Sequence, residues 1–221
     1  MYYSLLKQKR IDTNTFNNNN AIEKIAIPSV ITSISDEFFS NCSSLKQISI
    51  PSSVTLIEEF AFDNCLSLKK IEIPSSVKLI KQFAFRCCKS LSKITIDLSK
   101  TQVEDSSFED CTNLQNLIIS TTETKICQIN MTAFSNIIEI MIPQSVTCIS
   151  EFAFYDCKSL KKITIPSSVT SIGSSAFCEC TYLDTINIPD SVASIESDAF
   201  MGCISLTEIS IPSSVTVIKR G

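Results

Sequence analysis

Residues 165–187 read IPSSVTSIGSSAFCECTYLDTIN, and close copies of this 23-residue unit follow one another along the chain. Neighbouring prolines are 23 residues apart, except for one gap of three units. A cysteine and a phenylalanine recur on the same spacing. Three residue types that share one such period indicate a solenoid of stacked repeats. The three series are Pro28, Pro51, Pro74, Pro143, Pro166, Pro189 and Pro212; Cys42, Cys65, Cys88, Cys111, Cys157, Cys180 and Cys203; and Phe16, Phe39, Phe62, Phe85, Phe108, Phe154, Phe177 and Phe200.

The repeat divides the chain into two expected parts. A worn, Asn-rich copy precedes the full units, so we expect a degenerate N-terminal repeat or cap over residues 1–26. The solenoid is expected over residues 27–221, with eight 23-residue repeats and a truncated ninth. The worn copy keeps apolar residues at the expected offsets, at Ile11, Phe16, Ile22 and Ile25. Full repeats begin at Ile27, Ile50, Ile73, Ile96, Ile119, Ile142, Ile165 and Ile188.

Two middle repeats, 96–118 and 119–141, have lost the proline but keep their length. In the second of them, Met131 stands in place of the phenylalanine and Phe134 in place of the cysteine. Because the length is unchanged, we expect the coils to continue in register through both.

The apolar residues of each unit are three or four positions apart, which on its own is also typical of a helix. Two observations favour strands instead. The apolar positions are rich in Ile, Val, Thr, Ser and Cys, which are mediocre helix formers, and Pro follows an Ile-x-Ile segment where a strand would end. We therefore expect parallel strands at 45–50, 68–73, 91–96, 114–119, 137–142, 160–165, 183–188 and 206–211.

Composition excludes several classes of function. The chain of 221 residues has no His and only three Gly, and its formal net charge is -4. Without His there is no Ser-His-Asp or Cys-His nucleophile system, and most zinc sites are excluded. We therefore expect no enzyme, no catalytic or cofactor-binding residue and no metal, and the negative charge argues against a nucleic-acid partner. No apolar run is long enough for a transmembrane segment, and no signal peptide is visible, which by sequence alone favours the cytoplasm.

Two rows of side chains are candidates for a binding surface. The first lies on the outward positions of the expected strands and forms a charged strip, with plain solubility as the alternative interpretation. The second comes directly before the Ala-Phe pair of each unit, and it is either an exposed apolar row or additional core. The strip consists of Lys46, Lys69, Lys70, Glu72, Lys93, Glu139, Lys161, Lys162, Asp184 and Glu208. The apolar row consists of Phe60, Phe83, Ile129 and Phe152, with Ser106 at the same position of another unit.

The repeated cysteines should point inward, where a free thiol packs as a small hydrophobic group. Disulfides between neighbouring coils are the alternative, because the expected spacing is near the Cα separation that a disulfide needs. The pairs Cys87-Cys88 and Cys178-Glu-Cys180 each contain one such cysteine, and we expect the other member to face outward.

The unit Ile165-Pro-Ser-Ser-Val-Thr-Ser-Ile, followed by Ala176-Phe177 and Cys180-x-x-Leu-x-x-Ile186, resembles the BspA-like (Treponema pallidum type) leucine-rich repeats. The resemblance covers about residues 11–218. It implies a β-rich leucine-rich-repeat solenoid, a curved right-handed stack of coils with a parallel sheet on the concave face. It also implies a protein-binding solenoid at the cell surface, because several members are implicated as adhesins that bind matrix proteins or other cells.

A self-associating intracellular scaffold is the alternative function. This hypothesis rests on the C-terminal coil, whose apolar residues are expected to have nothing stacked beyond them: Ile209, Ile211, Val215 and Ile218. Lys219 and Arg220 are the only nearby charges that could discourage pairing with another chain. The identity of any ligand cannot be inferred from the sequence.

Overall fold

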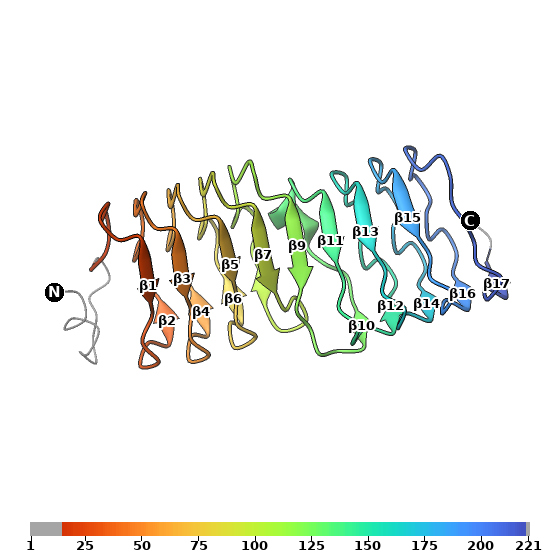
Figure 1. Cartoon of the computed structure of the whole chain (residues 1–221), viewed down its shortest axis with the longest axis horizontal. Helices are drawn as coiled ribbons and strands as arrows, with labels where there is room; N and C mark the ends of the chain where they lie inside the picture. The colour runs from red at the N-terminus through yellow and green to blue at the C-terminus, as the bar shows by residue number, and fades with distance from the viewer. Residues whose placement is uncertain (1–14, 220–221) are drawn as a thin grey trace. The chain divides into compact units, whose positions relative to one another are not determined.

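The computed structural model describes residues 15–219, which fall into two compact units. Unit 1 comprises residues up to 114 together with 132–136, and unit 2 comprises residues 115–131 and 137 onward. Ile11, Arg220 and most of the expected N-terminal cap lie outside the described residues. Each unit is a stack of coils whose strands run parallel, and the units are described separately below (Figure 1).

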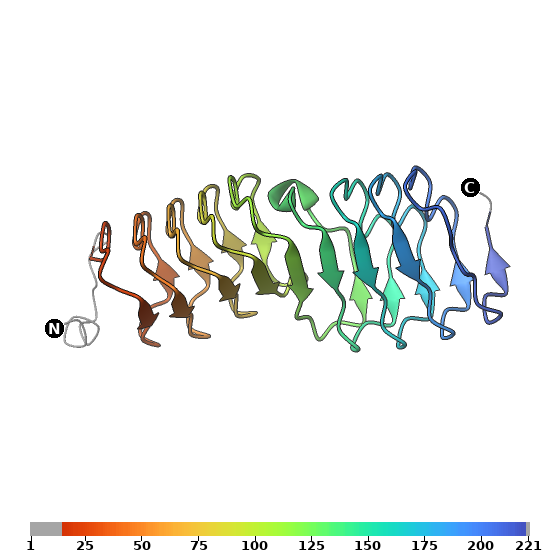
Figure 2. The same ribbon diagram turned by 45° about the horizontal axis from the view of Figure 1, so that its top comes forward.

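In unit 1, each coil contributes one strand to each of two parallel series. In the first, β1 pairs with β3 and β5 pairs with β7; in the second, β2, β4, β6 and β8 lie side by side (Figure 2). Partners in register are always 23 residues apart, as in Lys70 and Lys93. The first series consists of β1 (Lys24–Ala26), β3 (Gln47–Ser49), β5 (Lys70–Glu72) and β7 (Lys93–Ile96). The second consists of β2 (Ser33–Ile34), β4 (Leu56–Ile57), β6 (Leu79–Ile80) and β8 (Gln102–Val103).

Unit 2 repeats this arrangement. The strands β9, β11, β13 and β15 pair in sequence order, and so do β10, β12, β14, β16 and β17. The first series consists of β9 (Asn116–Ile119), β11 (Glu139–Met141), β13 (Lys162–Thr164) and β15 (Thr185–Asn187). The second consists of β10 (Lys125–Ile126), β12 (Cys148–Ile149), β14 (Ser171–Ile172), β16 (Ser194–Ile195) and β17 (Val217–Ile218).

The parallel solenoid expected from the sequence is confirmed, with strands shorter than expected. Seven of the eight expected strands contain β3, β5, β7, β9, β11, β13 and β15. The expectation for 206–211 is wrong, because the described chain forms no strand there. The second series was not foreseen, because two-residue strands are too short to show an alternating pattern.

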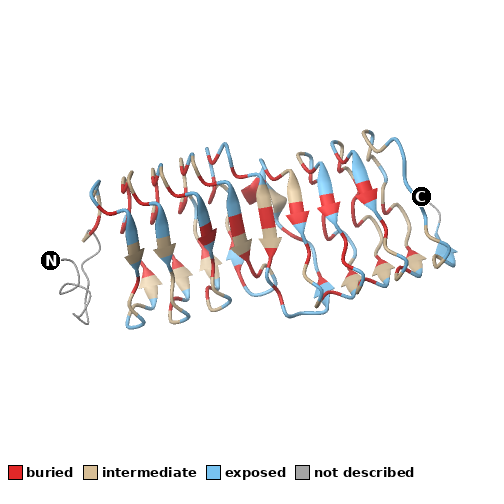
Figure 3. Ribbon diagram, viewed as in Figure 1, coloured by how far each residue is buried: buried red, intermediate tan, exposed pale blue. Residues whose placement is uncertain are grey.

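Buried residues recur in each coil of both units (Figure 3). The core of each unit contains a stack of phenylalanine rings from successive coils. In unit 1, Phe62 lies between Phe39 and Phe85, with ring centroids 5.2 and 4.9 Å apart. Each of these three rings is fully buried. In unit 2, Phe154 stacks on Phe177 at 5.3 Å. Each ring removes a large apolar surface from water, so this stack stabilises both units.

The worn middle of the chain departs from the expected register at one place. The short 3-10 helix η1 (Met131–Phe134) shifts the chain, so that the Phe134 ring stacks on Phe108 at 5.3 Å. Phe134 therefore takes the place of the missing phenylalanine. The spacing had suggested that it replaces the cysteine, and this expectation was wrong.

Candidate functional site

The repeated cysteines are free thiols that connect neighbouring coils. The Sγ of Cys88 donates to the carbonyl oxygen of Phe62 at 3.2 Å, and Cys65 and Cys111 make the equivalent bond to Phe39 and Phe85. Burial raises the pKa of Cys42 to about 11 and that of Cys88 well above its ordinary value. The thiols of Cys42 and Cys88 are therefore protonated and unreactive at neutral pH.

Two expectations for cysteines need correction. Cys203 is only half-buried, because no complete coil among the described residues covers it. Cys178 was expected to face outward but is buried with 2% exposure. Cys87, the other cysteine that was expected to face outward, is partly exposed, and its Sγ lies 3.8 Å from Asp110 Oδ2. No group of three or more Cys, Asp and Glu side chains within residues 15–219 is arranged to hold a metal ion.

The charged strip lies on the outward side of the first strand series in both units. In the three-residue strands β5, β11, β13 and β15 the central residue is a buried isoleucine, while the flanking side chains are more exposed. In unit 1, Lys46 forms an ion pair with Glu23 at 2.9 Å. Lys69, Lys70 and Lys93 are exposed, and none of them forms an ion pair with a described residue. In unit 2, Lys162 pairs with Glu139 at 3.4 Å. The remaining strip residues, Glu72, Lys161, Asp184 and Glu208, are also exposed.

The apolar row is partly surface and partly core. Phe60 and Phe83 are half-buried and stack on each other, with ring centroids 5.3 Å apart. Phe152 is 38% exposed, whereas Ile129 is buried and belongs to the core. The row therefore holds a stacked aromatic pair in unit 1 and an exposed aromatic ring in unit 2.

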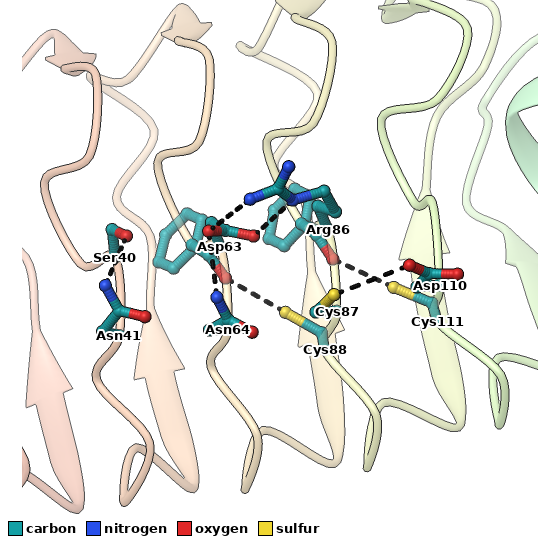
Figure 4. A network of polar contacts seen from close by, with 11 residues as sticks. Ser40, Asn41, Asp63, Asn64, Arg86, Cys87, Cys88, Asp110 and Cys111 are labelled. Atoms are coloured by element: carbon teal, nitrogen blue, oxygen red, sulfur yellow. Dashed lines mark hydrogen bonds and ion pairs between the residues drawn. The ribbon is translucent and has the colours of Figure 1, made fainter.

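An arginine that the sequence reasoning did not single out covers the aromatic pair in unit 1. The guanidinium carbon of Arg86 lies 5.0 Å from the ring centroid of Phe60 and 5.8 Å from that of Phe83. Its Nε and Nη2 atoms donate to the two carboxylate oxygens of Asp63, at 2.9 and 3.1 Å (Figure 4). This hydrogen bond raises the pKa of Arg86. A guanidinium held by a two-point ion pair above two rings is fixed in place, as few surface arginines are.

Asp63 is buried and is held by a second donor, the Nδ2 atom of Asn64, at 3.1 Å. Beside this cluster lies a hollow of about 350 Å³, within unit 1. Its lining consists of Asn17, Asn18, Glu37, Ser40, Asn41, Phe60, Asp63 and Arg86. The unit therefore has a small, mostly polar depression with one aromatic side chain and a fixed guanidinium.

The main chain around this cluster is left-handed at two positions of each coil. Phe60 and Phe83 have φ angles of 54° and 60°, and Asn41 and Asn64 have 58° and 57°. Asn tolerates this conformation, but a Phe there is unusual. Hydrogen bonds to the next coil stabilise it, such as the one from the Phe83 amide to the Ser106 carbonyl at 3.2 Å.

A signal for the cluster was present in the sequence. Asp63 and Arg86 are 23 residues apart, which places opposite charges at the same position of neighbouring coils. The frequent Asn and Asp just before the repeated cysteine also indicated a left-handed turn. That Arg86 would lie over two rings could not be inferred, because the spacing does not determine the direction of its side chain.

No helix of residues 15–219 is long and apolar enough to cross a membrane.

The family model of the BspA-type leucine-rich repeat region matches residues 9–137 and 121–221. Among solved structures, a leucine-rich repeat protein from Eubacterium ventriosum is 26% identical, with a TM-score of 0.45, over 88% of this chain and 47% of that chain. One from Bacteroides ovatus is 24% identical, with a TM-score of 0.39, over 95% and 78%. The T. pallidum leucine-rich repeat protein is 20% identical, with a TM-score of 0.48, over 90% and 71%. The chain spans about half the length of the first of these proteins. No curated protein matches it.

Proposed function

The chain belongs to the family of BspA-type leucine-rich repeat proteins, and from this premise we propose that it is a non-catalytic protein-binding solenoid. Its most concrete form is a surface adhesin that binds host matrix or cell-surface proteins. Extended repeat surfaces are commonly used to bind other proteins. The proposal extends this general property to the first strand series of this chain.

The observation that carries the proposal is the open outer side of that strand series. Parallel sheets are usually covered on both faces, whereas here the outward side chains of β5 and β7 are exposed or half-buried. Lys70 and Lys93 are partners in register, and neither has an ion pair among the described residues. Two like charges held side by side favour a partner that brings negative charge.

Binding to a panel of purified extracellular matrix proteins tests this proposal. The double variant Lys70→Glu/Lys93→Glu should weaken binding at least tenfold. The matched control Lys78→Glu/Lys89→Glu makes the same change in net charge in the same unit, at exposed lysines outside the strip. Equal losses in both variants would show that net charge alone matters, and no binding to any matrix protein would remove the adhesin form.

The alternative is the intracellular scaffold that associates with copies of itself. The observation in its favour is Ile204, an isoleucine of the repeat 188–210 that is 82% exposed. Labelling of surface proteins on intact cells separates the two functions, because it detects an adhesin and misses an internal scaffold. Sedimentation over a range of concentrations tests the association itself, which Ile211→Lys and Val215→Lys should abolish.

A further inference from the structure

The hollow beside Arg86 crosses several coils of unit 1. Four of its lining residues occupy the same position of successive coils, directly after the core phenylalanine: Asn17, Ser40, Asp63 and Arg86. Glu37 and Phe60 belong to the row two residues before that phenylalanine. The hollow therefore has a polar row along one side and a carboxylate and a phenyl ring along the other. Its volume of about 350 Å³ lies at the small end of the usual range for ligand sites.

Hydrogen-bonding groups in the hollow are fixed but not fully used. Glu37 accepts from Asn17 through Oε2 at 3.0 Å, which leaves Oε1 without a partner among the described residues. The Nδ2 atom of Asn41 donates to the hydroxyl oxygen of Ser40 at 3.3 Å, and the side-chain Oδ1 of Asn41 accepts from no described group. Arg86 binds Asp63 through Nε and Nη2, which leaves Nη1 as a donor. Donors and acceptors thus occur side by side, an arrangement that suits hydroxyl groups, which do both.

The aromatic row ends at the hollow. Phe60 stacks on Phe83 on the side of the following coil, whereas the preceding coil has Glu37 at the same position. No ring from that coil covers Phe60, so a flat group with an apolar face can pack there. The C–H face of a pyranose has this shape, and its rim of hydroxyls meets the polar groups on both sides.

Other ligand classes fit the hollow less well. Its lining has two carboxylates and one guanidinium, and the guanidinium is already paired, so an anion is not favoured. An apolar ligand would leave the surrounding amides and carboxylates without partners. No group of metal ligands is present among the described residues.

We propose that this hollow is a binding site for a neutral saccharide, held by Glu37, Asn41 and Arg86 and packed against Phe60. The site does not depend on the proposed protein ligand, because it lies among turn residues and not on the charged strip. A site of this size binds one or two sugar units, with a dissociation constant of about 1 mM.

Saturation-transfer NMR on the full chain tests the proposal, with glucose, galactose, mannose, N-acetylglucosamine and their linear tetramers as probes at about 10–20 mM. At least one saccharide should bind, with its ring C–H protons closest to the protein. The variant Glu37→Gly/Asn41→Gly should lose this binding at least tenfold. Both positions have positive φ, at 54° and 58°, so glycine fits the backbone there and the fold should persist.

The matched control is Ser175→Gly/Glu179→Gly, which also places glycine at two left-handed positions and removes one carboxylate, at the corresponding positions of unit 2, where φ is 51° and 62°. It should bind the saccharide as the unchanged chain does. Thermal unfolding of both variants verifies that they are folded. The proposal is overturned if no neutral saccharide binds, if both double variants bind equally, or if only a basic probe such as Nα-acetyl-lysine amide binds at the hollow.

Discussion

Units 1 and 2 are built from the same coil, but at two corresponding positions they present different surfaces. Phe83 and Arg86 in unit 1 correspond to Phe152 and Tyr155 three coils later. In unit 1, the guanidinium lies over stacked rings and is bound to Asp63. In unit 2, the two rings meet edge-on at 5.7 Å and are 38% and 41% exposed.

This comparison shows which properties the repeat fixes and which it leaves free. Phe83 and Phe152 have the same left-handed backbone, with φ of 60° and 56°. Each donates its amide hydrogen to the next coil, to Ser106 at 3.2 Å and to Ser174 at 3.0 Å. The coil therefore determines the main-chain conformation. The residue three positions after Phe83 or Phe152 determines whether a charged group covers the ring. Variants at matched positions of the two units can test this division.

The largest expected effect is on the core, where Phe62→Ala should lower the free energy of unfolding by about 3–5 kcal/mol, as large-to-small core changes do. Phe62 has an aromatic neighbour on both sides. Among the described residues of unit 2, Phe154 stacks on one ring, that of Phe177. Phe154→Ala should therefore cost less by about 0.5–1.5 kcal/mol. Chemical denaturation measures both, and a cost below about 0.5 kcal/mol would show that the rings face solvent.

High pH should destabilise the chain through the buried thiols. The pKa of Cys42 is raised to about 11 in the folded chain, from 9.0. Above pH 9 the unfolded chain releases this proton and the folded chain retains it, so stability is complete below pH 9 and falls as the pH rises to 11. The loss from this thiol is about 2–3 kcal/mol. Denaturation of the unchanged chain and of Cys42→Ala at pH 7, 9 and 10.5 measures it; equal pH dependence in the two chains would contradict the prediction.

Removal of the guanidinium should cost more than removal of its counterpart in unit 2. Arg86→Ala leaves the buried carboxylate of Asp63 with only the amide of Asn64, which should cost about 1–3 kcal/mol. Tyr155→Ala removes an exposed ring and should cost less than about 0.5 kcal/mol. Arg86→Lys should fall between them, because lysine keeps the charge and loses the two-point geometry. Thermal unfolding of the three variants decides; equal costs for Arg86→Ala and Tyr155→Ala would mean that the ion pair does not stabilise unit 1.

The smallest expected effect concerns the left-handed backbone itself. Ser175 has a φ angle of 51°, so Ser175→Gly should raise the free energy of unfolding by about 0.5–1 kcal/mol. At Gly202, where φ is 73°, an added Cβ would lie 2.7 Å from a carboxylate oxygen of Glu179. Gly202→Ala should therefore destabilise the chain. Opposite signs in the two unfolding experiments are the expected outcome, and a loss of stability in Ser175→Gly would contradict it.

The period of 23 residues was sufficient to predict the parallel coils, seven of the strands and the inward stacks of Phe and Cys. These features follow from the sequence because each copy must bury the same apolar positions against its neighbours. The sequence also placed the lysines of the strip on the outward side of the strands, since side chains alternate along a strand. Whether that strip binds a partner is still a prediction.

Other features were decided only in the tertiary structure. The displacement of Phe134 into the phenylalanine stack depends on a local 3-10 turn that the unchanged repeat length conceals. The position of Arg86 over Phe60 and Phe83 depends on the left-handed turns that direct those rings, and on Asp63 one coil earlier. Such contacts are between residues 23 or more positions apart, and they form only when the side chains point toward each other. The repeat therefore determined which residues are neighbours, but only the packed coils determined how their side chains meet.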